Sequence, residues 1–344
     1  MIKLTPLILF AIFFSSCKTQ QLYINVVEPA PVTIPSYIKS AGVINRSLTS
    51  DEAKVVDVID KVLSLEGANL DKEGAEASIE GLTDELMRNN RFTAIKPITS
   101  VNLRTTVPGL FPPPLEWDLV EKTTRENNVD ALFTLELFDT DTKISYQARK
   151  ANIKTPLGLI PGLEQQADML TIVKTGWRIY DPSGRNILDE YALSEDITFT
   201  GRGISPVLAA AALIGRKEAV KQVGNKAGQA YAWRLLPYEL RVTRDYYVKG
   251  TDNFKTARRK AQTGKWDQAG QLWEKETANP TGKIAGRACY NMAIISEING
   301  DLDLAIKWAQ KAYEDYGNRL ALRYIDILEY RKTSNRILQG QEER

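Results

Sequence analysis

Two periods of apolar and polar residues follow one another along this chain. From residue 38 to about 248, runs with the two-residue alternation of β-strands interchange with runs that have the 3.6-residue spacing of α-helices. Beyond residue 251 only the helical spacing remains. We therefore expect an α+β fold, in which a mixed-sheet α/β sandwich domain is followed by an all-α domain of helical hairpins.

The elements expected in the first domain alternate in type. Strands are predicted at 40–45, 91–98, 129–138, 169–180, 186–200 and 240–248, and helices at 50–65, 71–89, 115–127 and 206–235. Gly215, Gly224 and Gly228 should let the last of these helices approach the sheet closely. Residues 139–167 show no settled period, which predicts a long functional or mobile insertion.

The first seventeen residues have the pattern of an export signal. Lys3 precedes an uninterrupted apolar run from Leu7 to Phe14, which is far shorter than the roughly 20 residues that span a bilayer. Two small serines then precede Cys17. The stretch Phe-Ser-Ser-Cys at 14–17 resembles a bacterial lipobox, with phenylalanine where leucine is usual.

The lipobox resemblance implies that residues 1–16 are a cleaved signal peptide and that Cys17 carries lipid. Several acyl chains hold a protein stably to a membrane, which is then its first partner. Residues 17–37, which include three prolines, would form the lipidated tether. No aspartate and no acidic run follow Cys17, so the resemblance favours the outer membrane, with the protein facing the periplasm. The alternative is an ordinary cleaved signal with a coincidental cysteine.

Two segments of the helical region align at a constant spacing. Ala257, Gly264, Trp266, Ala269 and Leu272 correspond to Ala293, Gly300, Leu302, Ala305 and Trp308. A glycine ends one helix, and a large apolar residue followed by alanine lets the next helix pack closely. This pattern resembles the tetratricopeptide repeat, at a spacing of about 36 residues instead of the usual ~34. A further helix at about 319–338 can cap the pair.

Five positions fall where the tetratricopeptide family lines its concave face. These candidate ligand-binding residues are Phe254, Arg258, Arg287, Tyr290 and Glu297. The resemblance implies a protein or peptide partner. Independent solenoids normally need three or more repeats, so a helical brace for the α/β domain stays open as the alternative. Within the same region, Arg258-Arg259-Lys260 is the densest run of basic charge, which fits a solvated helix face or a contact with anionic lipid or a polyanion.

The composition of the chain excludes several kinds of catalytic and metal-binding site. The chain has no histidine, which removes histidine-dependent catalysis and histidine-ligated zinc. Its two cysteines, Cys17 and Cys289, predict no structural disulfide, and a net charge of +2 gives no bulk attraction to nucleic acid. We expect no cofactor, no metal and no enzymatic activity. The open alternative is an envelope hydrolase that uses carboxylates such as Asp139 and Asp141.

The whole chain resembles a family of uncharacterised Bacteroidetes lipoproteins with an N-terminal α/β domain and C-terminal tetratricopeptide-like repeats. The segments that carry the resemblance are 38–46, 230–237, 244–247 and the repeats. The α/β part also resembles, by element order, periplasmic domains of curli-secretion and TolB-like proteins. The resemblance implies an α/β domain at 38–249 and a helical domain at 250–344. We therefore expect a membrane-anchored periplasmic scaffold that binds a protein or peptide.

Overall fold

The structure is a computed structural model that describes residues 18–47, 61–89, 91–99, 111–155 and 158–342. The chain forms two compact units. Unit 1 consists of Met1–Glu28 and Glu239–Leu338, and unit 2 consists of Pro29–Tyr238 and Gln339–Arg344. Cys17, the predicted lipidation site, lies outside the described residues.

Unit 2 is built on a five-stranded mixed sheet in the order β3-β2-β4-β5-β6. The strands are β2 (Ser40–Asn45), β3 (Ala94–Pro97), β4 (Ala131–Thr155), β5 (Gly158–Asp181) and β6 (Asn186–Gly203). β2 runs parallel to β3 and β4, and the β4–β5 and β5–β6 pairs are antiparallel. The apolar run Ala-Gly-Val-Ile within β2 is buried, as expected for a strand that is covered on both faces.

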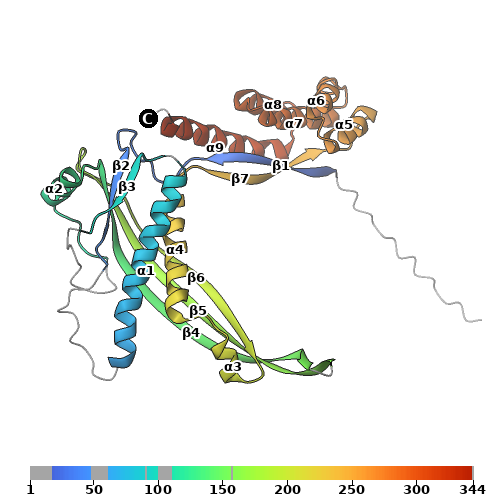
Figure 1. Cartoon of the computed structure of the whole chain (residues 1–344). Helices are drawn as coiled ribbons and strands as arrows, with labels where there is room; N and C mark the ends of the chain where they lie inside the picture. The colour runs from blue at the N-terminus through green and yellow to red at the C-terminus, as the bar shows by residue number, and fades with distance from the viewer. Residues whose placement is uncertain (1–17, 48–60, 90, 100–110, 156–157, 343–344) are drawn as a thin grey trace, which may run out of the picture. The chain divides into compact units, whose positions relative to one another are not determined.

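Four helices accompany this sheet in the described part of unit 2. They are α1 (Lys61–Arg88), α2 (Trp117–Asn127), α3 (Pro206–Ala211) and α4 (Arg216–Trp233). α1 and α4 lie side by side along the sheet (Figure 1). The core includes the ring of Trp177 on β5, which stacks on Tyr231 of α4 at a centroid distance of 5.2 Å. The buried apolar side chains of both helices belong to the same core as those of the sheet.

Two backbone contacts show why α4 needs glycine. A Cβ atom on Gly228 would lie 1.8 Å from the carbonyl oxygen of Ser78, and one on Gly224 would lie 2.4 Å from that of Gly74. Both carbonyl groups belong to α1, so these glycines permit a close helix–helix approach rather than the expected helix–sheet approach. Gly215 has open space around it and precedes α4 as its N-cap residue.

Three expectations about unit 2 were wrong in detail. The predicted insertion at 139–167 is instead the outer part of the β4–β5 hairpin, whose pairing continues to Thr155 and Gly158. The helix predicted from 71 begins at Lys61 and continues through Gly67, where the sequence predicted a break. The helix predicted at 206–235 is divided into α3 and α4, because Ala212–Gly215 leave the helical path. Residues 50–60 of the helix predicted at 50–65 lie outside the described residues.

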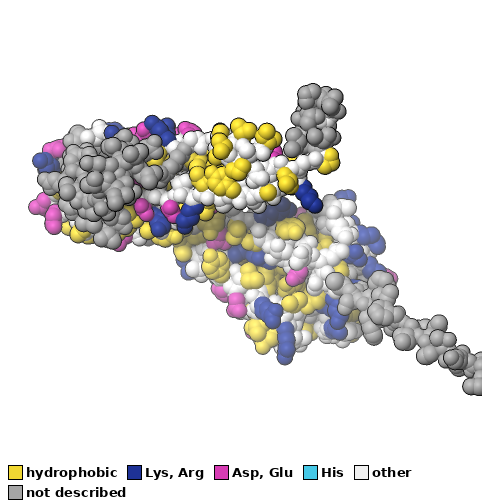
Figure 2. Space-filling view, turned by 90° about the horizontal axis from the view of Figure 1, so that it is seen from below, with side chains coloured by type: hydrophobic (Ala, Val, Ile, Leu, Met, Phe, Trp, Pro, Cys, Tyr) yellow, Lys and Arg dark blue, Asp and Glu magenta, His cyan; other side chains and the backbone are white. Residues whose placement is uncertain are grey.

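α3 rests on the sheet through a second close approach. A Cβ atom on Gly201 of β6 would lie 2.2 Å from the carbonyl oxygen of Ala209, so glycine lets the helix backbone touch the strand. Apolar side chains are exposed on α3 and just before it: Val207 on the helix is 76% exposed, and Ile204, which precedes the helix, is 68% exposed. Hydrophobic side chains also gather on the face of the molecule seen in Figure 2.

Unit 1 combines a two-stranded sheet with a run of helices. The strands are β1 (Thr19–Glu28) and β7 (Tyr238–Tyr247), and the helices are α5 (Asp252–Gln262), α6 (Trp266–Glu274), α7 (Gly282–Ile298), α8 (Leu302–Glu314) and α9 (Arg319–Glu342). Gly264 and Gly300 end their helices with φ of +76° and +82°, the left-handed conformation that glycine tolerates. The expected fold class is confirmed: a mixed sheet with helices precedes an all-helical region.

Two segments of unit 1 differ from the expected organisation. The segment expected as a tether at 17–37 contains β1, which pairs with β7. β7 itself, expected to complete the α/β sheet, lies in unit 1 with the helices. Among the described residues, none of the helices combines the length and apolarity needed to cross a membrane.

Candidate functional site

The face of α7 that the repeat pattern assigned to a ligand is covered by β7. The side chain of Asn291 accepts a hydrogen bond from the backbone N–H of Tyr247 at 2.7 Å and donates one to the carbonyl oxygen of the same residue at 2.7 Å. Arg287 donates to the carbonyl oxygen of Lys249 at 2.7 Å. An extended segment thus occupies this face, and it belongs to the chain itself.

A buried carboxylate holds β7 and α9 to α7. Glu297 accepts hydrogen bonds from Arg244 of β7 at 2.8 and 2.9 Å and from Arg331 of α9 at 2.6 Å, and also one from the hydroxyl group of Tyr324. Burial alone would raise its pKa, but the hydrogen bonds and the charge of Arg244 hold the pKa of Glu297 below its usual range. The carboxylate is therefore ionised, and its oxygens are fully engaged.

The structure corrects three of the five candidate ligand residues. Phe254, Tyr290 and Glu297 are buried, so they do not line an open surface. Phe254 packs in the core of unit 1, and the ring of Tyr290 contacts the rings of Tyr247 and Tyr324 at centroid distances of 5.4 Å. The physical reason is that β7 and α9 bury the groove that the repeat leaves between its first helices.

Arg258 and Arg287 are more exposed to solvent than the three buried candidates. Arg258 is exposed on α5. Arg287 is half-buried, and its guanidinium lies over the ring of Tyr247 at 5.2 Å. The structure brings Arg287 and Tyr290 together around Tyr247, as their three-residue spacing on one helix implies, while Arg258 lies on a different helix.

Several residues that organise this region were not identified from the sequence. Asn291 is a fully buried polar residue between apolar neighbours on α7, a pattern that signals a specific buried hydrogen bond. β1 was also missed. Its exposed residues Gln21, Tyr23 and Asn25 alternate with the less exposed Leu22 and Ile24, and this period of two was a readable strand signal.

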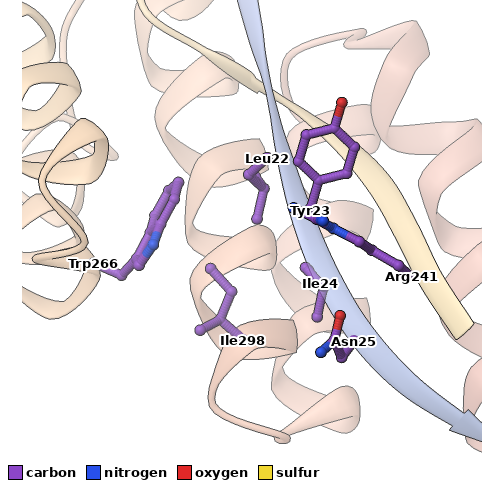
Figure 3. Close-up of a pocket in the computed structure, with 7 residues that line it drawn as sticks. All are labelled: Leu22, Tyr23, Ile24, Asn25, Arg241, Trp266 and Ile298. Atoms are coloured by element: carbon purple, nitrogen blue, oxygen red, sulfur yellow. The ribbon is translucent and has the colours of Figure 1, made fainter. Parts of the chain in front are cut away.

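An open groove remains along β1, and it is our candidate functional site. We call it the β1 groove; it has a volume of about 500 Å³. Its lining residues are Leu22, Tyr23, Ile24, Asn25, Arg241, Trp266 and Ile298. In Figure 3, Leu22 and Ile24 project from β1 toward the side of Trp266 and Ile298, whereas Tyr23 lies on the other side, beside Arg241. The groove therefore has an apolar wall and a polar rim.

The polar rim is held in place by packing. The guanidinium of Arg241 lies over the ring of Tyr23 at 4.4 Å from its centroid, which orients both side chains across the two strands. On the other wall, the ring of Trp266 meets Tyr246 edge to face at 5.4 Å. Preordered aromatic and arginine side chains are the residue types that contribute most to binding at protein interfaces.

The backbone of β1 has one free edge in the described part of unit 1. β1 pairs with β7 in a two-stranded sheet, so the N–H and C=O groups of every second residue point away from β7. Such an edge accepts an added strand from another chain. The β1 groove lies beside this edge, which places an apolar wall next to unpaired backbone groups.

The carboxylates proposed for a hydrolase do not form such a site. Asp139 and Asp141 lie on β4, and Asp141 is exposed and pairs with Lys143 at 3.4 Å. The buried Glu136 of unit 2 is bracketed by Arg46 at 2.5 Å and Arg178 at 3.5 Å and accepts from the hydroxyl groups of Thr134 and Tyr180. Among the described residues, no group of three or more acidic, cysteine or histidine side chains could hold a metal ion.

Two family models match this chain. The model of a domain of unknown function, DUF8603, covers residues 38–247, more than half of the sequence. The chain belongs to this family. The model of a second domain of unknown function, DUF6340, covers residues 255–330, the helices of unit 1. The expectation of an uncharacterised family is confirmed at this level; its lipoprotein character stays a proposal.

Comparison with other proteins adds only remote likeness. None of the curated proteins matches this sequence. Two structures of the PelC dodecamer from Paraburkholderia phytofirmans, one of them a variant, match with 9% and 10% identity. They cover 63% of this chain and 99% and 100% of the PelC chain, with TM-scores of 0.24 and 0.23. Likeness at these scores supports no inference about function.

Proposed function

We propose that this protein is a lipid-anchored scaffold of the cell envelope, facing the periplasm from the outer membrane, whose unit 1 binds an extended segment of a partner protein in the β1 groove. The observation that carries the proposal is the free edge of β1 beside the apolar wall of Trp266 and Ile298. The role is binding rather than catalysis, and it needs no cofactor, metal or nucleic acid.

The chemistry of the groove defines the partner. Backbone hydrogen bonds to the β1 edge would supply affinity for any extended segment. Apolar side chains at alternate positions of that segment would pack on Trp266 and Ile298, while its other side chains would face Asn25 and Arg241. Arginine pairs well with carboxylates, so an acidic residue in the partner segment would add specificity.

This proposal replaces the concave-face hypothesis. The extended ligand expected on α7 is already present as β7, held by Asn291 and Glu297. β1 pairs with β7 as the second strand of this sheet, and the outer edge of β1 is the next position at which a strand can add. The partner segment would thus become the third strand of the sheet formed by β7 and β1.

The binding proposal predicts that Asn25→Lys abolishes capture of the partner segment. Lysine on a strand edge obstructs the addition of a further strand, and Asn25 is exposed, so the fold should be retained. A photoreactive amino acid in place of Tyr23, which is 59% exposed, should crosslink one protein in intact cells. Mass spectrometry should map the adduct to a single segment with alternating apolar residues.

The matched control is Thr243→Lys, an exposed position on β7 that does not line the groove. It should leave the Tyr23 adduct at its original yield. Equal loss in both variants would point to a general charge effect. Adducts scattered over many proteins, or unaffected by Asn25→Lys, would contradict binding at the β1 edge.

Anchoring carries a second prediction: Cys17→Ser should abolish fatty-acid labelling and release the protein from the membrane fraction or leave it unprocessed. The control is Cys289→Ser. Cys289 is fully buried on α7, and burial raises the pKa of its thiol to about 11, so it is an inert core residue. Labelling of cells with an alkyne fatty acid measures the lipid on both variants, and fractionation measures their association with the membrane. Equal labelling of Cys17→Ser and the original chain would refute the anchor.

A further inference from the structure

We propose that the basic end of unit 1 binds anionic phospholipid headgroups beside the anchor. We define the basic end as Lys18, Arg258, Arg259, Lys260 and Lys265. The inference rests on the proposed lipid at Cys17 for its biological setting, but the surface and its test do not depend on the β1 groove or on the anchor itself.

The start of β1 is fixed to α5, which places the basic end next to the anchor. The carbonyl oxygen of Lys18 accepts a hydrogen bond from the N–H of Val248 at 3.1 Å. The side chain of Gln20, in the amide orientation that satisfies both its polar atoms, accepts from Arg258 at 3.0 Å and donates to the hydroxyl group of Tyr246 at 3.0 Å.

The short chain between Cys17 and Gln20 limits how far the anchor can be from α5. A residue spans at most ~3.6 Å, so the three steps of chain from Cys17 to Gln20 can span no more than about 11 Å. The headgroup and interfacial region on each side of a bilayer is roughly 5–8 Å thick, so a segment of this length can reach only a few ångströms beyond it. Acyl chains on Cys17 would therefore bring the carboxyl-terminal half of α5 to the membrane surface, with no long tether between them.

The charge of the basic end is not neutralised within the described part of unit 1. None of its five cationic groups forms an ion pair there. Arg259 donates to the hydroxyl group of Thr256 at 3.1 Å and Lys260 to the amide oxygen of Gln268 at 2.6 Å, both neutral partners. Asp252 pairs with Lys255 at 2.9 Å, and the charge of Arg259 also contributes to the lowered pKa of Asp252. Asp267 is the acidic residue nearest in sequence to Lys265, so two acidic residues stand against five cations. The end thus keeps an excess of positive charge.

This arrangement fits phosphate groups on a surface. Guanidinium groups pair with phosphate oxygens through two parallel hydrogen bonds, and lysines add charge without fixed geometry. Arg258 and Arg259 are adjacent and exposed, and Lys265 is exposed in the turn that follows α5. Anionic lipids carry phosphate charge at the membrane surface, and the resulting potential falls off within a Debye length. The anchor would hold these residues within that distance.

Flotation with vesicles tests the proposal directly. The chain from Lys18 to Arg344, which retains every described residue and lacks the anchor, should bind vesicles of phosphatidylglycerol and phosphatidylethanolamine and not vesicles of phosphatidylcholine. Arg258→Gln, Arg259→Gln and Lys260→Gln together should lower the partition coefficient about a hundredfold, since each cation near an anionic surface contributes roughly fivefold. Arg258→Lys with Arg259→Lys should retain most of the binding.

The matched control removes three exposed cations from the other end of the α5–α6 hairpin and beyond: Lys275→Gln, Lys283→Gln and Arg319→Gln. It should leave the partition coefficient nearly unchanged. If the first triple variant loses its circular-dichroism spectrum, Lys18→Gln with Lys265→Gln gives the same test with a loss of about thirtyfold. Equal binding to neutral vesicles, no binding to anionic ones, or equal loss in the control would overturn the proposal.

Discussion

Glu297→Gln is expected to lower the free energy of unfolding of unit 1 by about 3–5 kcal/mol. The side chain of Glu297 is completely buried and is the shared counter-ion of Arg244 and Arg331. A neutral amide would leave two largely buried guanidinium groups without a negative partner, and an uncompensated buried charge is costly. Chemical denaturation measures the loss, and hydrogen exchange should place it in β7, α7 and α9.

The matched control is Glu314→Gln, which neutralises an exposed glutamate on α8. Its effect should remain within about 0.5 kcal/mol, as is usual for a surface substitution. If Glu297→Gln proved equally neutral, the buried network would be refuted and the residue would return to the set of candidate ligand contacts.

Acid should reveal the same ion network. The pKa of Glu297 is lowered in the folded protein, so its contribution to stability is complete above the unfolded pKa of about 4.3 and is lost as the pH falls through the folded value. Glu297→Gln should therefore be destabilised near neutral pH, yet show a shallower further loss below about pH 4. A parallel acid dependence in both proteins would contradict the lowered pKa.

Gly228→Ala should destabilise unit 2 by about 3 kcal/mol, although alanine is the better helix former. Its Cβ atom would lie 1.8 Å from the carbonyl oxygen of Ser78, a backbone atom that a side-chain rotation cannot move. α1 and α4 would have to separate along their shared interface. Thermal or chemical unfolding reports the loss, and hydrogen exchange in α1 and α4 should locate it.

Gly340→Ala on α9 provides the matched control, because a Cβ atom there meets nothing within 4 Å. Helix propensity should make this change neutral or stabilising by up to about 1 kcal/mol. The two substitutions therefore differ in sign only if the helix–helix contact is real. A stabilising effect of Gly228→Ala would mean that α1 and α4 are not in close contact.

Local patterns were sufficient where an element's own residues determine its conformation. The strand predicted at 40–45 is β2, and the strands predicted at 169–180 and 186–200 lie within β5 and β6. The glycine–alanine spacing of the helical region also located the helix ends at Gly264 and Gly300, because a left-handed residue after a helix strongly favours glycine. In these places, sequence and structure are linked by interactions only a few residues apart.

Long-range pairing decided the rest. Residues 139–152 carry charged and polar side chains on both faces, so they show no strand period. They form a strand because β5 satisfies their backbone in register. β1 is paired with a strand that follows it by more than two hundred residues, and its free edge became visible only through that pairing.

The candidate site shows the same division. The sequence by itself determined that α7 presents residues suited to an extended peptide, since repeat spacing fixes which side chains share a helix face. Only the tertiary structure decided that β7 of the same chain takes that place, through Asn291 and Glu297. The physical reason is that a binding groove and an intramolecular contact use the same side chains, and sequence spacing specifies the face of a helix but not what covers it.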